Sequence, residues 1–317
     1  MGSSGKGYPM KLTVQIAPGN ERGLELKNPV VAASGTIGYG TEYAELVDIN
    51  RLGAVVSKGT TLKPRPGNPQ PRLCETASGL LNSVGLENKG IEAVIAEEAP
   101  VWAKWDVPVL VNIAGDGVDD YAELAYALDG VAGVSGIEVN ISCPNVARGG
   151  MEFGTSAKDA AAVTRAVKGH TTLPVVVKLT PNVTDIAEIA CAAEEAGADA
   201  ISLVNTLRGM AIDVEARKPF LGGVTGGLSG PAIKPVALYM VHRVAQAVKV
   251  PVIGGGGIVS ARDAIEFIMA GASAFWVSTG VLIDPDAPLE VLDGVVEFMQ
   301  REGVEDIAEL IGAAASA

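Results

Sequence analysis

Short apolar runs rich in β-branched residues recur along the chain, and stretches with apolar residues at helical spacing separate them. The runs that predict strands cover residues 29–33, 54–57, 108–113, 136–141, 174–179, 200–204, 250–254 and 274–277. Residues 186–196 and 232–248 show helical patterns. Near-continuous apolar strands joined by helices indicate a parallel sheet buried on both faces. Eight such units in about 250 residues favour an α/β fold, a single (β/α)8 TIM barrel, over an open doubly wound sheet, which usually has fewer strands.

Two segments are longer than the connections of a barrel require. Residues 60–88, after the second predicted strand, are rich in Pro, Gly and Asn. Residues 206–231, after the sixth, contain Gly222-Gly-Val-Thr-Gly-Gly-Leu-Ser-Gly230. Long structured loops are usually functional, and in a barrel both lie at the carboxyl-terminal face, where active sites are built. Residues 12–16 and 23–26 predict a small hairpin that closes the opposite end.

Composition and charge limit the kinds of protein that this chain can be. With 317 residues, 48% of them hydrophobic, the chain can bury a large core as one domain. We expect residues 11–317 to form the barrel and residues 1–10 to be a flexible or expression-derived leader, because no apolar region typical of a signal peptide follows them. No apolar run is long enough to span a membrane. The net charge of −13 argues against a nucleic-acid partner, so local cations must meet an anionic substrate.

The three cysteines, Cys74, Cys143 and Cys191, show neither CxxC spacing nor an evident disulfide pattern. This usage predicts a reduced, cytoplasmic protein. Three thiols are too few for a four-thiolate zinc or iron–sulfur site, so we expect no metal on this chain. A cysteine is most often a small buried hydrophobe. We interpret Cys191, within an apolar helical stretch, in this way, and Cys74 has no catalytic neighbours in the sequence.

Cys143 stands in a different context. It follows a predicted strand, precedes a proline and is flanked by Ser142 and Asn145, a setting that suits proton removal better than core packing. An unperturbed thiol has a pKa of about 8.5, and nearby lysine charge raises its thiolate fraction. His170 and His242 do not end strands, so Cys143 is the best candidate for a general base.

Polar residues or glycines stand at the carboxyl end of every predicted strand. In chain order they are Ser34-Gly35, Lys58-Gly59, Asn112, Asn140, Lys178, Asn205-Thr206, Gly254-Gly-Gly-Gly257 and Ser278-Thr279-Gly280. Parallel strands of a barrel end at one rim, so these groups converge. Lys58 and Lys178 each end an apolar strand. A lysine there is either solvated or, at a catalytic face, stabilises negative charge on a reduced flavin or a substrate carboxylate.

The glycines after the last two strands predict a phosphate site. Glycine clusters let backbone N–H groups approach a phosphate, often at a helix N-terminus, and Ser260 is a candidate N-cap for the helix that follows. Four glycines alone could equally make a tight turn between strand and helix. Their pairing with Ser278-Thr279-Gly280 at the next strand end favours the phosphate site.

The run Asn140-Ile-Ser-Cys-Pro-Asn-Val146 resembles the active-site loop of the dihydroorotate dehydrogenases. The other blocks that match are Asn28-Pro-Val-Val-Ala-Ala-Ser-Gly-Thr36, Gly67-Asn-Pro-Gln-Pro-Arg72, Asn82-Ser-Val-Gly-Leu-Glu-Asn88 and Gly226-Gly-Leu-Ser-Gly-Pro-Ala-Ile-Lys-Pro235. The likeness runs in order from about residue 12 to residue 285. It implies a single FMN-binding (β/α)8 barrel that oxidises dihydroorotate to orotate in pyrimidine (UMP) biosynthesis.

The resemblance also implies residue roles. Cys143 would take the C5 proton of dihydroorotate while hydride passes from C6 to N5 of FMN, and Lys58 would contact both flavin and substrate. The substrate pocket would contain Asn82, Ser83, Val84, Gly85, Leu86, Asn140, Asn145, Asn205 and Thr206. FMN would be held by Ser34, Gly59, Asn112, Asn140, Lys178, Val204, Gly230, Gly256, Gly257, Ser278 and Thr279, with Lys178 beside the flavin N1 and C2 carbonyl. We further predict that Arg148-Gly149-Gly150 hinges the Cys143 loop as a lid.

The subclass follows from the same loop. A cysteine base is similar to class 1, and Val146-Ala-Arg-Gly-Gly-Met-Glu-Phe-Gly154 is similar to the NAD-linked class 1B, whose catalytic subunits pair with subunits carrying FAD and a [2Fe-2S] cluster. We therefore expect a homodimer joined by two such electron-transfer subunits. The alternatives are a self-sufficient class 1A homodimer that uses fumarate, a flavin-binding subunit without catalysis, and a tRNA-modifying flavin barrel. The intact Asn-Cys-Asn loop argues against the second, and the acidic composition argues against the third.

Overall fold

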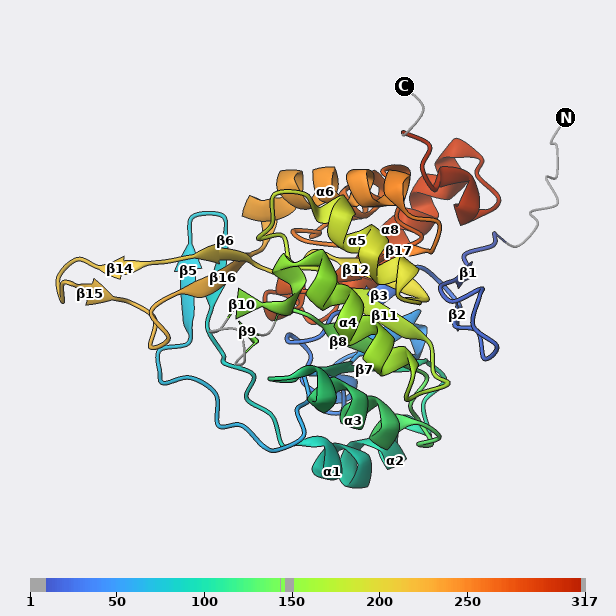
Figure 1. The fold of residues 1–317 in the computed structure, drawn as a ribbon. Helices are drawn as coiled ribbons and strands as arrows, with labels where there is room; N and C mark the ends of the chain where they lie inside the picture. Colours follow the sequence, from blue (N-terminus) through green and yellow to red (C-terminus); the bar gives the residue numbers. More distant parts are fainter. Residues whose placement is uncertain (1–9, 143, 146–150, 315–317) are drawn as a thin grey trace, which may run out of the picture.

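Eight parallel strands close into a barrel in the computed structural model, which describes residues 10–142, 144–145 and 151–314 (Figure 1). In order around the barrel they are β3 (Val30–Ala32), β4 (Ala54–Val56), β7 (Val109–Ile113), β8 (Gly136–Asn140), β11 (Val175–Lys178), β12 (Ala200–Leu203), β17 (Val252–Gly254) and β18 (Ala274–Val277). Strand β18 pairs with β3 and closes the ring. Each strand lies within a predicted run, so the prediction of a (β/α)8 barrel is confirmed.

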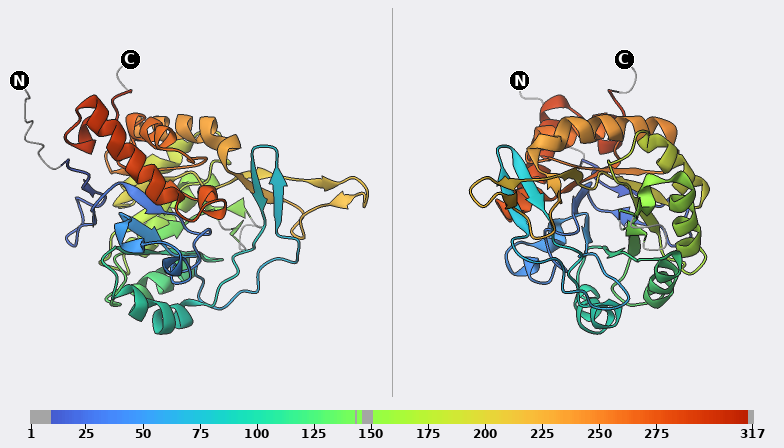
Figure 2. Two further views of the ribbon diagram at one scale, coloured as in Figure 1. Left: turned by 180° about the vertical axis from the view of Figure 1, so that it is seen from behind. Right: turned by 60° about the vertical axis from the view of Figure 1, so that its left-hand side comes forward.

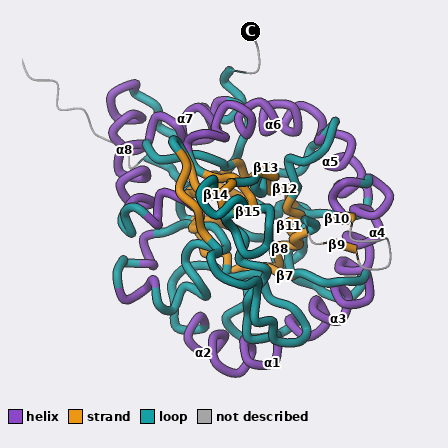
Figure 3. The backbone as a smooth tube through the Cα atoms, turned by 90° about the vertical axis from the view of Figure 1, so that its left-hand side faces the viewer, coloured by secondary structure: helices purple, strands orange, loops and turns teal. Residues whose placement is uncertain are grey.

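Helices surround the strands in a ring (Figure 3). After β7, β8, β11, β12, β17 and β18 come α3 (Val118–Leu128), α4 (Ala157–Lys168), α5 (Ile186–Glu195), α6 (Lys234–Ala247), α7 (Ala261–Met269) and α8 (Ala287–Glu302). Between β4 and β7, α1 (Ile91–Ala93), a π-helical turn (Val94–Glu98) and α2 (Ala99–Trp102) run without a break. Between β3 and β4 lie the 3-10 turns Tyr43–Glu45 and Ile49–Arg51. In the described part of the chain, the remaining 3-10 turns are Phe153–Thr155, Pro231–Ile233, Thr279–Leu282 and Ile307–Leu310.

The helical predictions are confirmed to within a few residues. Helix α5 fills the range predicted at residues 186–196, and α6, with the 3-10 turn before it, fills most of the range at 232–248. The predicted N-cap of α7 is also confirmed, because the Ser260 side chain accepts a hydrogen bond from the Asp263 N–H. Within the described residues, no helix is both long and apolar enough to cross a membrane.

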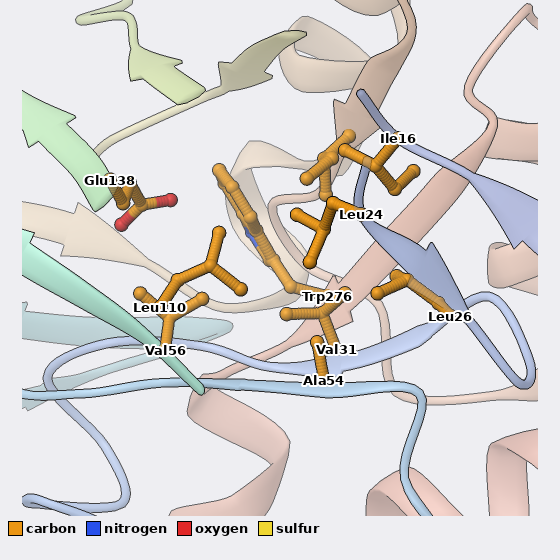
Figure 4. Close-up of a pocket in the computed structure, with 10 residues that line it drawn as sticks. Ile16, Leu24, Leu26, Val31, Ala54, Val56, Leu110, Glu138 and Trp276 are labelled. Atoms are coloured by element: carbon orange, nitrogen blue, oxygen red, sulfur yellow. The ribbon is translucent and has the colours of Figure 1, made fainter. Parts of the chain in front are cut away.

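An N-terminal hairpin closes the amino-terminal end of the barrel, as predicted. It consists of β1 (Val14–Gln15) and β2 (Glu25–Leu26), which pair antiparallel. Its apolar side chains and those of the barrel enclose a cavity of only about 10 Å³, roughly the room of one water molecule. Figure 4 shows this space, lined by Ile16, Leu24, Leu26, Val31, Ala54, Val56, Leu110, Glu138, Ile253 and Trp276. The hairpin therefore fits the barrel end tightly.

The two long segments form one antiparallel sheet at the other end of the barrel, which the sequence did not predict (Figure 2). Its order is β13 (Leu207–Gly209), β16 (Gly226–Ser229), β6 (Gly79–Asn82) and β5 (Leu73–Thr76). A hairpin of β14 (Ile212–Asp213) and β15 (Lys218–Pro219) extends from it, and β9 (Pro144–Asn145) pairs with β10 (Met151–Glu152) nearby. This pairing was hard to predict because the strands contain several glycines, which interrupt the alternation of apolar and polar residues that indicates a strand. A Cβ on Gly227 would lie 1.9 Å from Thr206 Oγ1, so glycine is required there.

The predicted boundary between a leader at residues 1–10 and the barrel domain stays a prediction. Met10, the first described residue, is partly buried and packs against the core.

Shortening a side chain of the hairpin should destabilise the fold. Leu26 is 1% exposed, and Leu26→Ala is expected to lower the free energy of unfolding by about 2–5 kcal/mol, because a cavity replaces packed methyl groups. Leu46→Ala, at a leucine that is 67% exposed, is the control and should change it by less than about 0.5 kcal/mol. Urea unfolding followed by circular dichroism measures both, and equal effects would show that the hairpin does not seal the core.

Candidate active site

A cavity of about 680 Å³ lies at the carboxyl ends of the barrel strands, beneath the antiparallel sheet. This volume is within the range of roughly 300–1,000 Å³ that is typical of small-molecule and cofactor sites. Residues in or just after all eight barrel strands line it, from Ser34 after β3 to Ser278 after β18. The prediction that the strand-end groups converge is therefore confirmed in their placement.

Most of the predicted site residues line this cavity. They are Ser34, Lys58, Gly59, Asn82, Ser83, Val84, Gly85, Leu86, Asn112, Asn140, Lys178, Val204, Asn205, Thr206, Gly256, Gly257, Ser278 and Thr279. Gly230 is not among the residues that line the cavity, but its carbonyl oxygen lies 2.8 Å from where a Cβ on Gly257 would stand. Asn145 belongs to β9. Cys143 and the predicted hinge Arg148-Gly149-Gly150 lie outside the described residues, and the roles of all these residues stay predictions.

A buried carboxylate, Glu138 on β8, joins the strands beneath the cavity. Its Oε2 accepts hydrogen bonds from Asn112 Nδ2 on β7 (2.6 Å) and Ser34 Oγ (3.4 Å). Its Oε1 accepts from Ser202 Oγ on β12 (3.0 Å). Glu138 is 2% exposed, and a charge this deep is tolerated only when it is paired and hydrogen-bonded. The network therefore fixes how these strands meet at the floor of the site.

Lys178 supplies the positive charge of that network. Its Nζ lies 3.4 Å from Glu138 Oε2, donates to Ser34 Oγ at 3.1 Å and stands 4.4 Å from the centre of the Trp276 ring. The lysine is 7% exposed and lines the cavity. Because the carboxylate below it, the ring beside it and the serine hold its ammonium group, one cation faces the cavity in a fixed position.

Amide and hydroxyl groups line another part of the cavity. Asn205 Nδ2 donates to Asn140 Oδ1 (3.3 Å) and to Ser142 Oγ (3.0 Å). Asn140 Oδ1 also accepts from the Ser142 N–H, and Asn205 Oδ1 accepts from the Thr206 N–H. Asn82 Nδ2 donates to the Gly227 carbonyl across the antiparallel sheet. Such groups present both donors and acceptors, which suits a small ring that carries carbonyl and N–H groups.

The cavity concentrates positive charge in an acidic protein. Among the described residues that line it, Lys58, Arg65, Lys178 and Arg208 are cationic and Glu87 and Glu152 are anionic. The chain as a whole carries −13. Lys58 Nζ lies 3.6 Å from Glu87 Oε2, and Arg72 Nη1 lies 3.0 Å from the same oxygen. Arg65 pairs with Asp116, Lys178 with Glu138 and Arg208 with Glu152. Because Asp116 and Glu138 do not line the cavity, cations outnumber carboxylates at its surface, although each cation has an acidic partner.

The glycine turns at the far side of the cavity leave room for a ligand to approach the backbone. Gly256 and Gly257 have φ of 133° and 85°, values that L side chains rarely adopt. Thr279 Oγ1 donates to Ser229 Oγ at 2.9 Å, which ties the turn after β18 to the antiparallel sheet. Because β17 pairs with β18 in the barrel, the turns after these two strands are neighbours; their role as a phosphate site stays a prediction.

Sequence reasoning missed several residues of the site. Glu138 and Ser202 could have been found, because each is a polar residue that interrupts an apolar strand. Trp276 and Arg208 gave no local signal, since only the closed barrel and the antiparallel sheet bring them to the cavity.

One prediction about the cysteines is wrong. Cys191 is only half-buried, and its Sγ lies 3.6 Å from the Ala247 carbonyl on the outer helices. Partial burial and the nearby carboxylates of Glu194, Glu195 and Asp185 raise its pKa. The apolar stretch around it is a helix whose buried face does not include this position. Cys74 is half-buried on β5.

A family model described as dihydroorotate dehydrogenase matches residues 18–299. The chain belongs to the dihydroorotate dehydrogenase family. Several relatives bear the name dihydroorotate dehydrogenase B (NAD(+)), catalytic subunit. The protein of Desulforamulus reducens is 54% identical, with 96% of this chain and 99% of the relative covered. That of Desulforudis audaxviator is 56% identical (96% and 98% covered), and that of Pelobacter propionicus is 55% identical (95% and 98% covered).

The effects of substituting Glu138 and Lys178, the buried ion pair beneath the cavity, should be strongly non-additive. Glu138→Leu leaves Lys178, Asn112 and Ser202 without their buried acceptor and should lower the free energy of unfolding by about 3–5 kcal/mol. Adding Lys178→Met removes the uncompensated charge, so the double variant should be less destabilised than the sum of the two single variants.

Urea unfolding of four flavin-free proteins, namely the wild type, the two single variants and the double variant, gives the coupling free energy directly. Arg301→Met, at an exposed surface pair with Glu302, is the control and should change stability by less than about 0.5 kcal/mol. Additive effects of the two core substitutions would contradict the network.

Proposed function

We propose that this chain is the catalytic subunit of an NAD-linked dihydroorotate dehydrogenase, which oxidises dihydroorotate to orotate with FMN bound in the cavity. The observation that carries the proposal is Lys178, a buried lysine held by Glu138 and Trp276 so that its charge faces a large cavity of amide and glycine groups. A fixed cation there suits a flavin, because negative charge develops on the flavin ring system when it is reduced. Family membership and the names of the relatives support the substrate and the acceptor.

The residues of the cavity fit FMN. Lys178 and Asn112 offer donors for the carbonyls and ring nitrogens of the flavin. The turns at Gly256, Gly257, Ser278 and Thr279 offer backbone groups for a phosphate. A Cβ on Gly257 would meet backbone and side-chain atoms within 3.1 Å, so this turn holds its shape only as glycine. When bound, FMN would supply the two-electron oxidant that accepts the C6 hydride of dihydroorotate.

The chain's own residues would bind the substrate and move its proton. Asn82, Asn140, Asn205 and Thr206 would hydrogen-bond the ring carbonyls and N–H groups, and Lys58 would meet the carboxylate. The Cys143 thiolate would take the proton from C5 and release it to water in a later step. The bonds among Asn140, Ser142 and Asn205 orient this amide cluster before the substrate arrives, which lowers the entropic cost of reaching the reactive geometry.

The partner and location are finer parts of the proposal. We infer a homodimer joined by two electron-transfer subunits that carry FAD and a [2Fe-2S] cluster, because the relatives are named as catalytic subunits of an NAD(+) enzyme. Those names do not favour the fumarate-using class 1A alternative or a subunit without catalysis. A cytoplasmic location is proposed from the cysteine usage alone.

Cys143→Ser should slow flavin reduction while leaving flavin binding intact. In anaerobic stopped-flow mixing with L-dihydroorotate, we expect rapid bleaching of the wild-type flavin and a rate lower by about 10²–10⁴-fold in the variant at pH 7, because serine is a much weaker acid than cysteine. At pH 9 the wild type should speed up as more thiolate forms.

Cys191→Ser is the matched control and should match the wild type. Equal bleaching in wild type and Cys143→Ser would exclude Cys143 as the base, and a wild-type flavin that never bleaches would exclude the substrate.

The electron acceptor should distinguish the two subclasses. The isolated chain is expected to oxidise dihydroorotate with an artificial dye acceptor but to show no measurable turnover with fumarate, and none with NAD until an electron-transfer subunit is added. Steady-state orotate formation measures all three. Rapid fumarate-dependent turnover of the isolated chain would instead favour the class 1A alternative.

A further inference from the structure

The first turn of α6 packs directly on the glycine turn after β17. A Cβ on Gly257 would lie 2.9 Å from Lys234 Cβ and 3.1 Å from Lys234 N. Gly257 lines the cavity, and so does Ile233, the residue before Lys234. Lys234 belongs to the run 226–235, one of the blocks that carry the resemblance to the family. It is not among the residues that line the cavity, and the proposed chemistry gives it no role.

The Lys234 side chain reaches away from the cavity to α7. Its Nζ donates to Asp263 Oδ1 and lies 2.8 Å from Glu266 Oε2. The second oxygen of Asp263 accepts from the Val259 N–H (3.1 Å) and from Ser260 Oγ (2.8 Å). Val259 and Ser260 directly continue the glycine turn. One carboxylate therefore ties the start of α6 to the backbone that forms the turn, and we refer to Lys234, Asp263 and Glu266 as the α6–α7 clamp.

Lys234 and Asp263 of the clamp are both charged at neutral pH. Burial alone would raise the pKa of Asp263, but hydrogen bonds from Lys234, Ser260 and the Val259 N–H together hold that pKa below its ordinary value. Burial would lower the pKa of Lys234, and its bonds to Asp263 and Glu266 raise that pKa overall. Because two carboxylates surround the single ammonium group, Lys234 has no free positive charge to offer a ligand. It can act on the turn only through position.

We propose that Lys234 is a positioning residue for the cofactor phosphate, because the α6–α7 clamp holds the turn at residues 255–260 in the shape that binds it. This inference rests on the proposed function, since it requires FMN in the cavity. The role of Lys234 concerns only the phosphate end of the cofactor. The ring end would be held by Lys178 and Asn112, which belong to other strands.

Comparing FMN with riboflavin, which lacks the phosphate, isolates this role. Flavin is removed from the full-length protein, and each flavin is titrated back with its fluorescence as the readout. Lys234→Met is expected to weaken FMN binding by about tenfold, equivalent to about 1.4 kcal/mol, while riboflavin binding stays within about threefold of the wild type. Lys234→Arg, which keeps a charged donor for both carboxylates, should retain most of the preference for FMN.

Asp263→Asn separates position from charge. The substitution removes a negative charge near the phosphate, so a simple charge effect would tighten FMN binding. The clamp predicts weaker FMN binding, because an amide offers one acceptor oxygen and cannot hold Lys234 and the turn together. This variant also tests the proposal if Lys234→Met fails to fold.

Lys168→Met provides the matched control. Lys168 Nζ lies 2.7 Å from Asp199 Oδ2, in a pair of similar exposure that ties α4 to the start of β11 at the closed end of the barrel. It should leave both flavin affinities unchanged. Parallel losses of FMN and riboflavin binding in Lys234→Met, or tighter FMN binding in Asp263→Asn, would overturn the inference. A wild-type protein that binds neither flavin would overturn the proposed function instead.

Discussion

The Glu138 carboxylate is the interaction on which the rest of the site depends. It lies inside the barrel and accepts hydrogen bonds from Ser34, Asn112 and Ser202 while it pairs with Lys178. An ionised group at this depth is stable only when its partners all keep their places. A shift of β7, β11 or β12 by one residue would turn a partner to the other face of the sheet. The network therefore fixes the strand register and the cation that faces the cavity at the same time.

The two ends of the barrel divide stability and chemistry between them. The hairpin at the amino-terminal end leaves almost no space, and apolar groups line what remains. The carboxyl-terminal end opens into a cavity of about 680 Å³ that is lined by residues from all eight strand ends, polar at most of them and glycine after β17. Trp276 lines both cavities, and Glu138 lines the small one while it pairs with Lys178, which lines the large one. The packed end of the barrel therefore supports the residues at the base of the site.

The supporting contacts around the cavity act on different parts of a ligand. The Glu138 network positions Lys178, the bonds among Asn140, Ser142 and Asn205 orient the amide cluster, and the α6–α7 clamp holds the glycine turn. Each of these three sets of contacts joins segments that belong to, or follow, different barrel strands. Rigid scaffold strands with polar loops at their ends allow such parts to be arranged independently, which is why one barrel can combine a cofactor site with a substrate site.

The sequence by itself determined the barrel, because eight buried parallel strands must be apolar throughout and their spacing leaves room for a helix between most of them. It also determined which strand ends are polar, and through motifs such as Asn140-Ile-Ser-Cys-Pro-Asn-Val146 it indicated the family. Only the tertiary structure decided the antiparallel sheet over the cavity, since Leu81 pairs with Leu228 across nearly half the chain and glycines leave no pattern to read. Tertiary structure also revealed the bonds of Glu138 and the clamp of Lys234, because a side chain's partners depend on how distant strands and helices pack.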